Sequence, residues 1–261
     1  MQGFLFLLFF IAIVAAIVYG CIYVTKKRRQ DLELVARQLK MDFYPKGDDS
    51  IAPMLSNLEF FMYGERCRVS NLIRGQVKSN GQLISVAIFD YRYTICKRRS
   101  TEFSVDENSV SISSNEENDT FCQTVLVFYD ESIDVPGFSL RPEHLWDKLA
   151  NFAGYEDINF DRFPAFSKGY RLLSNQVDDV RNLFQPNLIK FYETNKICTE
   201  AIGPYLLVYP FPPKYTNSSL TMGDKTFTTS QYLQPKEVKP YFDLGLKLLS
   251  LLEKNMSAVR Q

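Results

Sequence analysis

The chain has 261 residues, of which 46% are hydrophobic and 23% are charged, enough for one large folded domain or two small ones. Its 21 Phe and 15 Tyr residues supply ample apolar area for a core and exclude a disordered chain. The 30 basic residues balance the 30 acidic ones, which excludes a general attraction to nucleic acid.

The first 25 residues contain no charged side chain and predict a transmembrane helix over residues 3–25. A helix of roughly 23 residues rises about 35 Å, which is enough to cross a hydrocarbon core of about 30 Å. A cleavable signal peptide has basic residues before an apolar run of about 7–15 residues, and this chain departs from both features. Bulky Tyr19 disfavours lipoprotein processing at Cys21, because a small residue is expected at that place. We therefore expect the anchor to be retained.

Residues 26–40 predict a basic juxtamembrane helix. Apolar residues recur at i, i+3, i+4 and i+7 from Leu32, with charges on the opposite face. The N-terminal side of the anchor has no basic residue, so the positive-inside rule places the N-terminus outside and the rest of the chain in the cytoplasm. We expect a single-pass protein of the cell inner (plasma) membrane. Its membrane-surface residues are expected to be Lys26, Lys27, Arg28 and Arg29.

Residues 41–261 predict a cytoplasmic α+β domain, a mainly antiparallel sheet with packed helices, which can divide into two subdomains near residue 136. Before residue 136, runs of β-branched and aromatic residues predict the strands 66–73, 83–95, 101–112 and 121–129. The polar, acidic run 113–119 predicts an exposed hairpin loop. The basic run 97–99 predicts a solvated hairpin tip.

The strand over residues 83–95 shows the clearest alternation of side chains. Phe89, Tyr91 and Tyr93 fall on one face, whereas Asp90 and Arg92 fall on the other. We expect the aromatic face to be buried, and the charges on the polar face to pair with those of neighbouring strands. The alternative is that Asp90 and Arg92 form part of a functional site.

After residue 136 the pattern mixes strands with helices. The predicted strands are 157–160, 166–173 and a hairpin of 197–202 with 205–209 that turns at Gly203-Pro204. The predicted helices are 141–153, 178–192 with an interruption near Pro186, and 241–254. Residues 214–227 predict a polar loop.

The residue types exclude most familiar catalytic and metal chemistry. His144 is the only histidine, which removes His-rich metal sites and any nucleophile–histidine site built elsewhere. The five cysteines are widely spaced without a C-x-x-C pair, which disfavours disulfides and a cysteine zinc site. No phosphate loop, dinucleotide-binding turn or nucleophile elbow is present. The sequence therefore selects no catalytic, cofactor-binding or metal-binding residue, and we expect no cofactor.

Four short motifs stand in order along the chain: F-D-Y-R-Y-T from Phe89, F-x-L-R-P-E from Phe138, D-I-N-F from Asp157 and P-x-F-x-x-x-Y-x-L from Pro164. With the anchor and the basic helix, they resemble a group of uncharacterised bacterial single-pass membrane proteins over most of the chain. Residues 166–188 are also similar to a wider bacterial family known as a domain of unknown function. The resemblance implies a bacterial membrane protein and transfers no activity or site residue.

These observations favour a membrane-anchored cytoplasmic interaction or binding domain whose ligand the sequence does not name. One alternative is an enzyme with a pocket of carboxylate, Tyr or Lys side chains, although the sequence leans against an enzyme. Another is a structural envelope or assembly protein. The expected partners are the membrane and an unidentified protein, with no nucleic acid. A deep cleft with converging titratable groups would favour the enzyme. An open apolar patch or sheet edge would favour binding.

Overall fold

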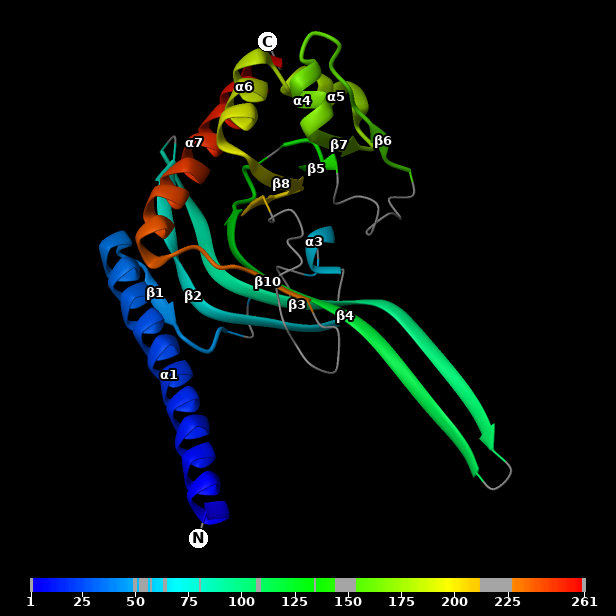
Figure 1. The fold of residues 1–261 in the computed structure, drawn as a ribbon. Helices are drawn as coiled ribbons and strands as arrows, with labels where there is room; N and C mark the ends of the chain where they lie inside the picture. The colour runs from blue at the N-terminus through cyan, green and yellow to red at the C-terminus, as the bar shows by residue number, and fades with distance from the viewer. Residues whose placement is uncertain are drawn as a thin grey trace.

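The computed structural model describes residues 2–48, 51, 56, 58–62, 65–79, 81–106, 109–133, 135–143, 154–211 and 227–259. An N-terminal helix leads into a large, mainly antiparallel sheet that is covered by further helices (Figure 1). The α+β fold class predicted from the sequence is confirmed.

Helix α1 (Gln2–Leu39) joins the apolar segment and the basic segment in one continuous helix of 38 residues. Its described apolar side chains before residue 26 are exposed, and its N-terminal half projects away from the rest of the fold in Figure 1. In the part of the chain that is described, it is the one helix long and apolar enough to cross a membrane, with a mean hydropathy of 2.7. The second half behaves differently, because Leu32, Val35 and Ala36 are buried as the spacing predicts.

One ten-stranded sheet includes strands from both sides of residue 136, in the order β1-β2-β3-β4-β9-β8-β5-β7-β6. Among the described strands every pairing is antiparallel except that of β10, which runs parallel to β4. The strands are β1 (Asp42–Tyr44), β2 (Glu65–Ser79), β3 (Gln82–Asp106), β4 (Ser109–Tyr129), β5 (Phe138–Pro142), β6 (Glu156–Asp157), β7 (Tyr170–Ser174), β8 (Ile197–Ile202), β9 (Tyr205–Pro210) and β10 (Phe227–Gln231).

Helices cover both faces of the sheet, unequally. The further helices are α3 (Glu59–Met62), α4 (Pro164–Gly169), α5 (Val177–Leu183), α6 (Pro186–Asn195) and α7 (Pro235–Val259). The second half of α1 and helices α4 to α7 pack on one face and form the larger core. Gly245 of α7 lies so close to β4 that a Cβ atom there would stand 2.3 Å from Leu126 Cδ2. The other face carries a smaller, aromatic core that includes Phe60 of α3.

Strands β3 and β4 extend well beyond the sheet as a two-stranded ribbon (Figure 1). The predicted hairpin loop at residues 113–119 is wrong, because these residues lie in β4 and pair with β3. The run 97–99 likewise lies within β3 and not at a tip. The ribbon turns between Asp106 and Ser109 instead. Backbone hydrogen bonds hold a two-stranded ribbon together whatever the polarity of its side chains. A polar run is therefore not enough to locate the turn.

Two other boundaries differ from prediction for local reasons. Arg141 and Pro142 end strand β5 and do not begin a helix; residues 144–153, including His144, lie outside the described residues. Residues 166–169 belong to helix α4, which Pro164 starts as its first residue, and the strand begins only at Tyr170. The polar run 214–226 also lies outside the described residues.

Three predicted features of the second half are confirmed. The chain breaks between α5 and α6 at Pro186, and β8 and β9 pair antiparallel around Gly203, whose φ is +51°. The closing helix is present but begins earlier, at Pro235, and runs through Pro240. Pro240 is exposed and lies in the second turn of this helix.

Candidate functional site

Asp90 is the centre of a buried polar cluster between α1 and the sheet. Its side chain, only 2% exposed, accepts hydrogen bonds from Arg28 Nε at 3.0 Å and Arg28 Nη2 at 2.9 Å. Asn71 Nδ2 at 2.8 Å and Thr124 Oγ1 at 2.9 Å donate the other two. A buried carboxylate is tolerated only when it is paired and hydrogen-bonded, and the forked guanidinium meets both oxygens. The cluster therefore fastens α1 to β3.

The four predicted membrane-surface residues do not share one environment. Lys26, Lys27 and Arg29 are exposed. Arg28 points into the domain, where its Nη1 also donates a hydrogen bond to the carbonyl of Leu233 at 2.8 Å. The structure thus separates Arg28 from the other three, because only its position on α1 faces the buried acid.

The predicted alternation of β3 is present, but the partner of Asp90 is different from the one expected. Phe89, Tyr91 and Tyr93 are all buried in the aromatic core. The cation that neutralises Asp90 comes from α1 and not from a neighbouring strand, while Arg92 is exposed. Only tertiary packing brings together two residues 62 positions apart, and no local pattern marks the pair.

A second buried ion pair lies on the aromatic face of the sheet. Arg141 Nη2 of β5 stands 3.2 Å from Glu200 Oε2 of β8, and both side chains are almost fully buried. Glu200 also accepts the backbone N–H groups of Glu59 and Phe60, so it fastens α3 to the sheet. Burial raises the pKa of Glu200, and the neighbouring Arg141 opposes that shift.

Glu59 beside this pair titrates near neutral pH. Burial, and next the charge of Glu200, raise its pKa from 4.5 to about 7, although Arg141 and a hydrogen bond with Tyr155 act in the opposite direction. The thiol of Cys198 is fully buried on the same face, and burial raises its pKa well above the ordinary value. Such a thiol stays protonated and is a poor nucleophile. The cluster can hold or release a proton, but it presents no activated nucleophile among these residues.

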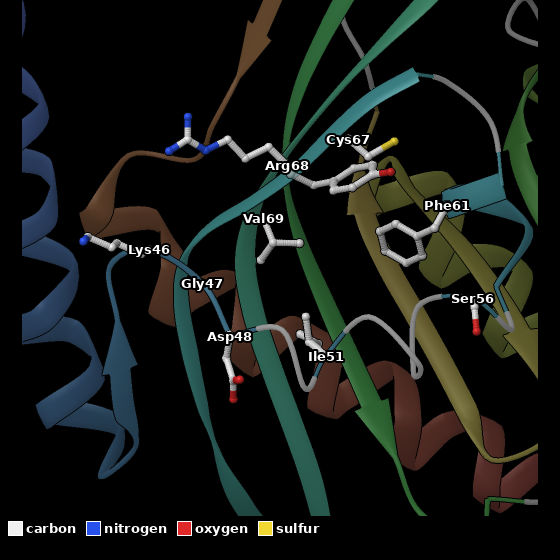
Figure 2. Close-up of a pocket in the computed structure, with 10 residues that line it drawn as sticks. Lys46, Gly47, Asp48, Ile51, Ser56, Phe61, Cys67, Arg68 and Val69 are labelled. Atoms are coloured by element: carbon white, nitrogen blue, oxygen red, sulfur yellow. The ribbon is translucent and has the colours of Figure 1, made fainter.

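A cavity of about 490 Å³ opens between β2 and the segment that follows β1. Figure 2 shows Lys46 on one side and Phe61 on the other, with Val69 and Ile51 between them. The cavity is lined by Lys46, Gly47, Asp48, Ile51, Ser56, Phe61, Cys67, Arg68, Val69 and Tyr91.

The wall of the cavity depends on a close approach of backbone to backbone. Gly47 has a φ of +82°, and a Cβ atom there would lie 2.9 Å from the carbonyl oxygen of Val69. Glycine is therefore required for this turn. Asp48 is fixed by Arg74 of β2, whose Nη1 lies 3.4 Å from its carboxylate. The cationic residues that line the cavity are Lys46 and Arg68.

No family model, curated protein or solved structure matches the chain. No group of three or more His, Cys, Asp or Glu side chains suited to a metal ion occurs within the described ranges. The function must therefore be inferred from the geometry of the cavity and the two buried clusters.

The cavity suits binding better than either buried cluster does. Lys46 and Arg68 are exposed residues of its lining, while Phe61 and the buried ring of Tyr91 supply apolar surface. Burial, with a hydrogen bond to Cys67, raises the pKa of Tyr91, so its hydroxyl stays neutral. Such a mixture fits a ligand that has an anionic group beside an apolar part. Sequence reasoning did not bring these residues together, because they come from α3, β2, β3 and the segment after β1.

Proposed function

We propose that this protein is a membrane-anchored cytoplasmic binding domain, with α1 as its anchor and the cavity beside β2 as its ligand site. The observation that carries the proposal is the division of α1 into two halves. The most apolar stretch of the first half is not buried against any other part of the protein. In the second half, Leu32, Val35 and Ala36 belong to the core. An exposed apolar surface of this length is unfavourable in water and matches the hydrocarbon core of a bilayer.

The ion pair of Arg28 and Asp90 supports a tether of fixed orientation. Arg28 follows the apolar segment by only three residues, and its guanidinium is held by two bonds to Asp90 and one to Leu233. The domain cannot swing freely about the anchor while these bonds persist. A domain presented at a constant attitude suits recognition of a partner near the same membrane.

Membrane integration is tested by alkaline carbonate extraction of the full chain. We expect the protein to stay in the membrane pellet with α1 intact by mass spectrometry. Release into the supernatant, or a mass that lacks the first 20 or so residues typical of signal cleavage, would contradict the anchor.

The ligand site is tested by recovery of partners from membranes in mild detergent. The charge-reversed double variant Lys46→Glu, Arg68→Glu should lose the molecules that the unaltered protein retains. The matched control, Lys78→Glu with Lys254→Glu, changes the same net charge at exposed positions outside the cavity and should retain them. Identical recovery by all three proteins would rule out the cavity as the site.

An enzyme is the second candidate, and Glu59 is the observation that favours it. A carboxyl group with a pKa of about 7 suits general acid–base catalysis at neutral pH. A screen of chromogenic ester, glycoside and phosphate substrates should compare the unaltered protein with Glu59→Gln. Turnover that is abolished in the variant, with unchanged folding, would support the enzyme. Turnover that is equal in both would remove Glu59 from any active site.

A further inference from the structure

A long groove of about 960 Å³ runs between α1 and the beginning of α7, just beyond the apolar segment. Its α1 side includes Lys27, Asp31 and Leu34, and its α7 side includes Lys236 and Lys239. These two sides are about 200 residues apart in the sequence, so the groove exists only in the folded chain.

The height of the groove above the apolar segment follows from one hydrogen bond. Arg28 Nη1 contacts the carbonyl of Leu233 at 2.8 Å, which places the start of α7 beside Arg28. Arg28 lies three residues after Thr25, about 5 Å further along the helix axis. The polar headgroup layer of a bilayer is roughly 5–8 Å thick on each side of the hydrocarbon core. The first turn of α7 therefore lies at the level of the headgroups if α1 spans the membrane.

The groove has the charge and the apolar surface that a phospholipid requires. Three lysines and one aspartate line the groove. Of the lysines, Lys239 forms an ion pair with Asp243 at 2.6 Å. The structure records no ion pair for Lys27 or Lys236 among the described residues, and both are exposed. Leu34, which is 55% exposed, adds apolar surface beside these cations.

We propose that this groove binds the headgroup of an anionic phospholipid from the leaflet that adjoins residue 26. The inference rests on the proposed membrane anchor, because the anchor brings the groove to the headgroup layer. Lysines next to a membrane attract anionic lipids, and here they come from both α1 and α7. The closing helix is thus a second point of membrane contact, which fixes the attitude of the domain together with the Arg28–Asp90 pair.

Two exposed lysines on α7 provide a matched test. Lys236 and Lys254 are 18 residues apart, which is five whole turns, so they share one side of the helix about 27 Å apart. Only Lys236 lines the groove. The full chain, purified in mild detergent, is titrated with phosphatidylglycerol or phosphatidylcholine, and retained lipid is counted by native mass spectrometry.

The unaltered protein and Lys254→Glu should retain phosphatidylglycerol in preference to phosphatidylcholine. Lys236→Glu should weaken phosphatidylglycerol retention by about tenfold or more, because a cation that attracts the headgroup becomes an anion that repels it. Equal retention by the two variants would overturn the inference. Displacement by a polyglutamate peptide, without any preference between the lipids, would also overturn it and assign the groove to an acidic protein segment.

Carbonate extraction of each variant separates this inference from the proposed anchor. If the proteins remain integrated but Lys236→Glu retains lipid normally, the groove proposal fails and the anchor stands. If the unaltered protein is released by carbonate, the anchor itself fails.

Discussion

At the scale of single residues, the informative groups are buried charges whose partners come from distant segments. Asp90 and Glu200 each join a covering helix to the sheet, α1 in one case and α3 in the other. Both carboxylates are nearly inaccessible, so each is held by several hydrogen-bond donors. Their contribution to stability depends on keeping the whole set of partners.

The first prediction concerns the Arg28–Asp90 pair. Asp90→Asn should lower stability by about 2–4 kcal/mol, because it leaves a partly buried guanidinium without its counter-charge. Arg28→Met should also destabilise, and the double variant should lose less than the sum of the two. Thermal unfolding of the full chain in mild detergent measures all three.

The control for this cycle is Arg92→Met, an exposed position on the same strand. It should shift stability by less than about 0.5 kcal/mol. Strictly additive effects of Arg28→Met and Asp90→Asn would contradict the assigned coupling.

The second prediction concerns pH and Glu59. Its pKa is raised from 4.5 to about 7 on folding, so the folded state holds a proton that the unfolded chain releases first. Stability from this group is therefore fully present below pH 4.5 and is lost as the pH rises to about 7. In the Glu59→Gln variant the melting temperature should depend less on pH over this range, and the variant should be the more stable protein at pH 7.5.

Glu200 shifts in the same direction, so the difference between the unaltered protein and the variant isolates Glu59. Melting curves recorded from pH 4 to pH 8 provide the measurement. Parallel curves for the two proteins would show that Glu59 is not the titrating group.

At the scale of elements, the ribbon of β3 and β4 extends beyond the strands that flank it in the sheet. Pairing of β2 with β3 ends at Thr94, and β10 pairs with β4 only over residues 119–123. Beyond these positions the two strands pair with each other alone within the described chain. No other described strand therefore depends on the outer part of the ribbon for its pairing.

The third prediction is that this outer part can be removed. Replacing residues 97–117 by Asn-Gly should give a short hairpin closed by the existing pair of Cys96 and Asn118, because this dipeptide favours the tight turn that joins antiparallel strands. We expect the melting temperature to change by only a few degrees, which corresponds to a change of about 1 kcal/mol or less in the free energy of unfolding. By contrast, a deletion of only four residues inside the sheet, the paired residues 87–88 and 126–127, should prevent folding. Unfolding of the shortened ribbon variant would contradict this interpretation.

At the scale of the whole molecule, the direction of insertion remains a prediction. The four basic residues Lys26–Arg29 follow the apolar segment directly, so by the positive-inside rule Gln261 should lie in the cytoplasm. A reporter fused after Gln261 should be active if it requires the cytoplasm and silent if it requires export. Moving Lys26–Arg29 ahead of the apolar segment should weaken or reverse this result, and the opposite pattern in the unaltered chain would contradict it.

The sequence by itself determined the features that depend on local order. The uncharged run, the periodicity from Leu32, the alternation from Phe89 to Tyr93 and the breaks at Pro186 and Gly203 each follow from helix or strand geometry. The structure confirms the apolar helix, the α+β fold and these elements. The turn of the ribbon was misplaced, because a polar run resembles a loop whether or not its backbone is paired.

Only the tertiary structure decided which residues meet. Arg28 reaches Asp90 across 62 positions, Arg141 reaches Glu200 across 59, and Lys236 of α7 lies in one groove with Lys27 of α1. The sequence placed Arg28 among four equivalent surface cations, yet packing of α1 against the sheet turns it towards a buried acid. Burial, distance and local charge set the chemistry of such groups, and these quantities do not exist until distant segments pack together.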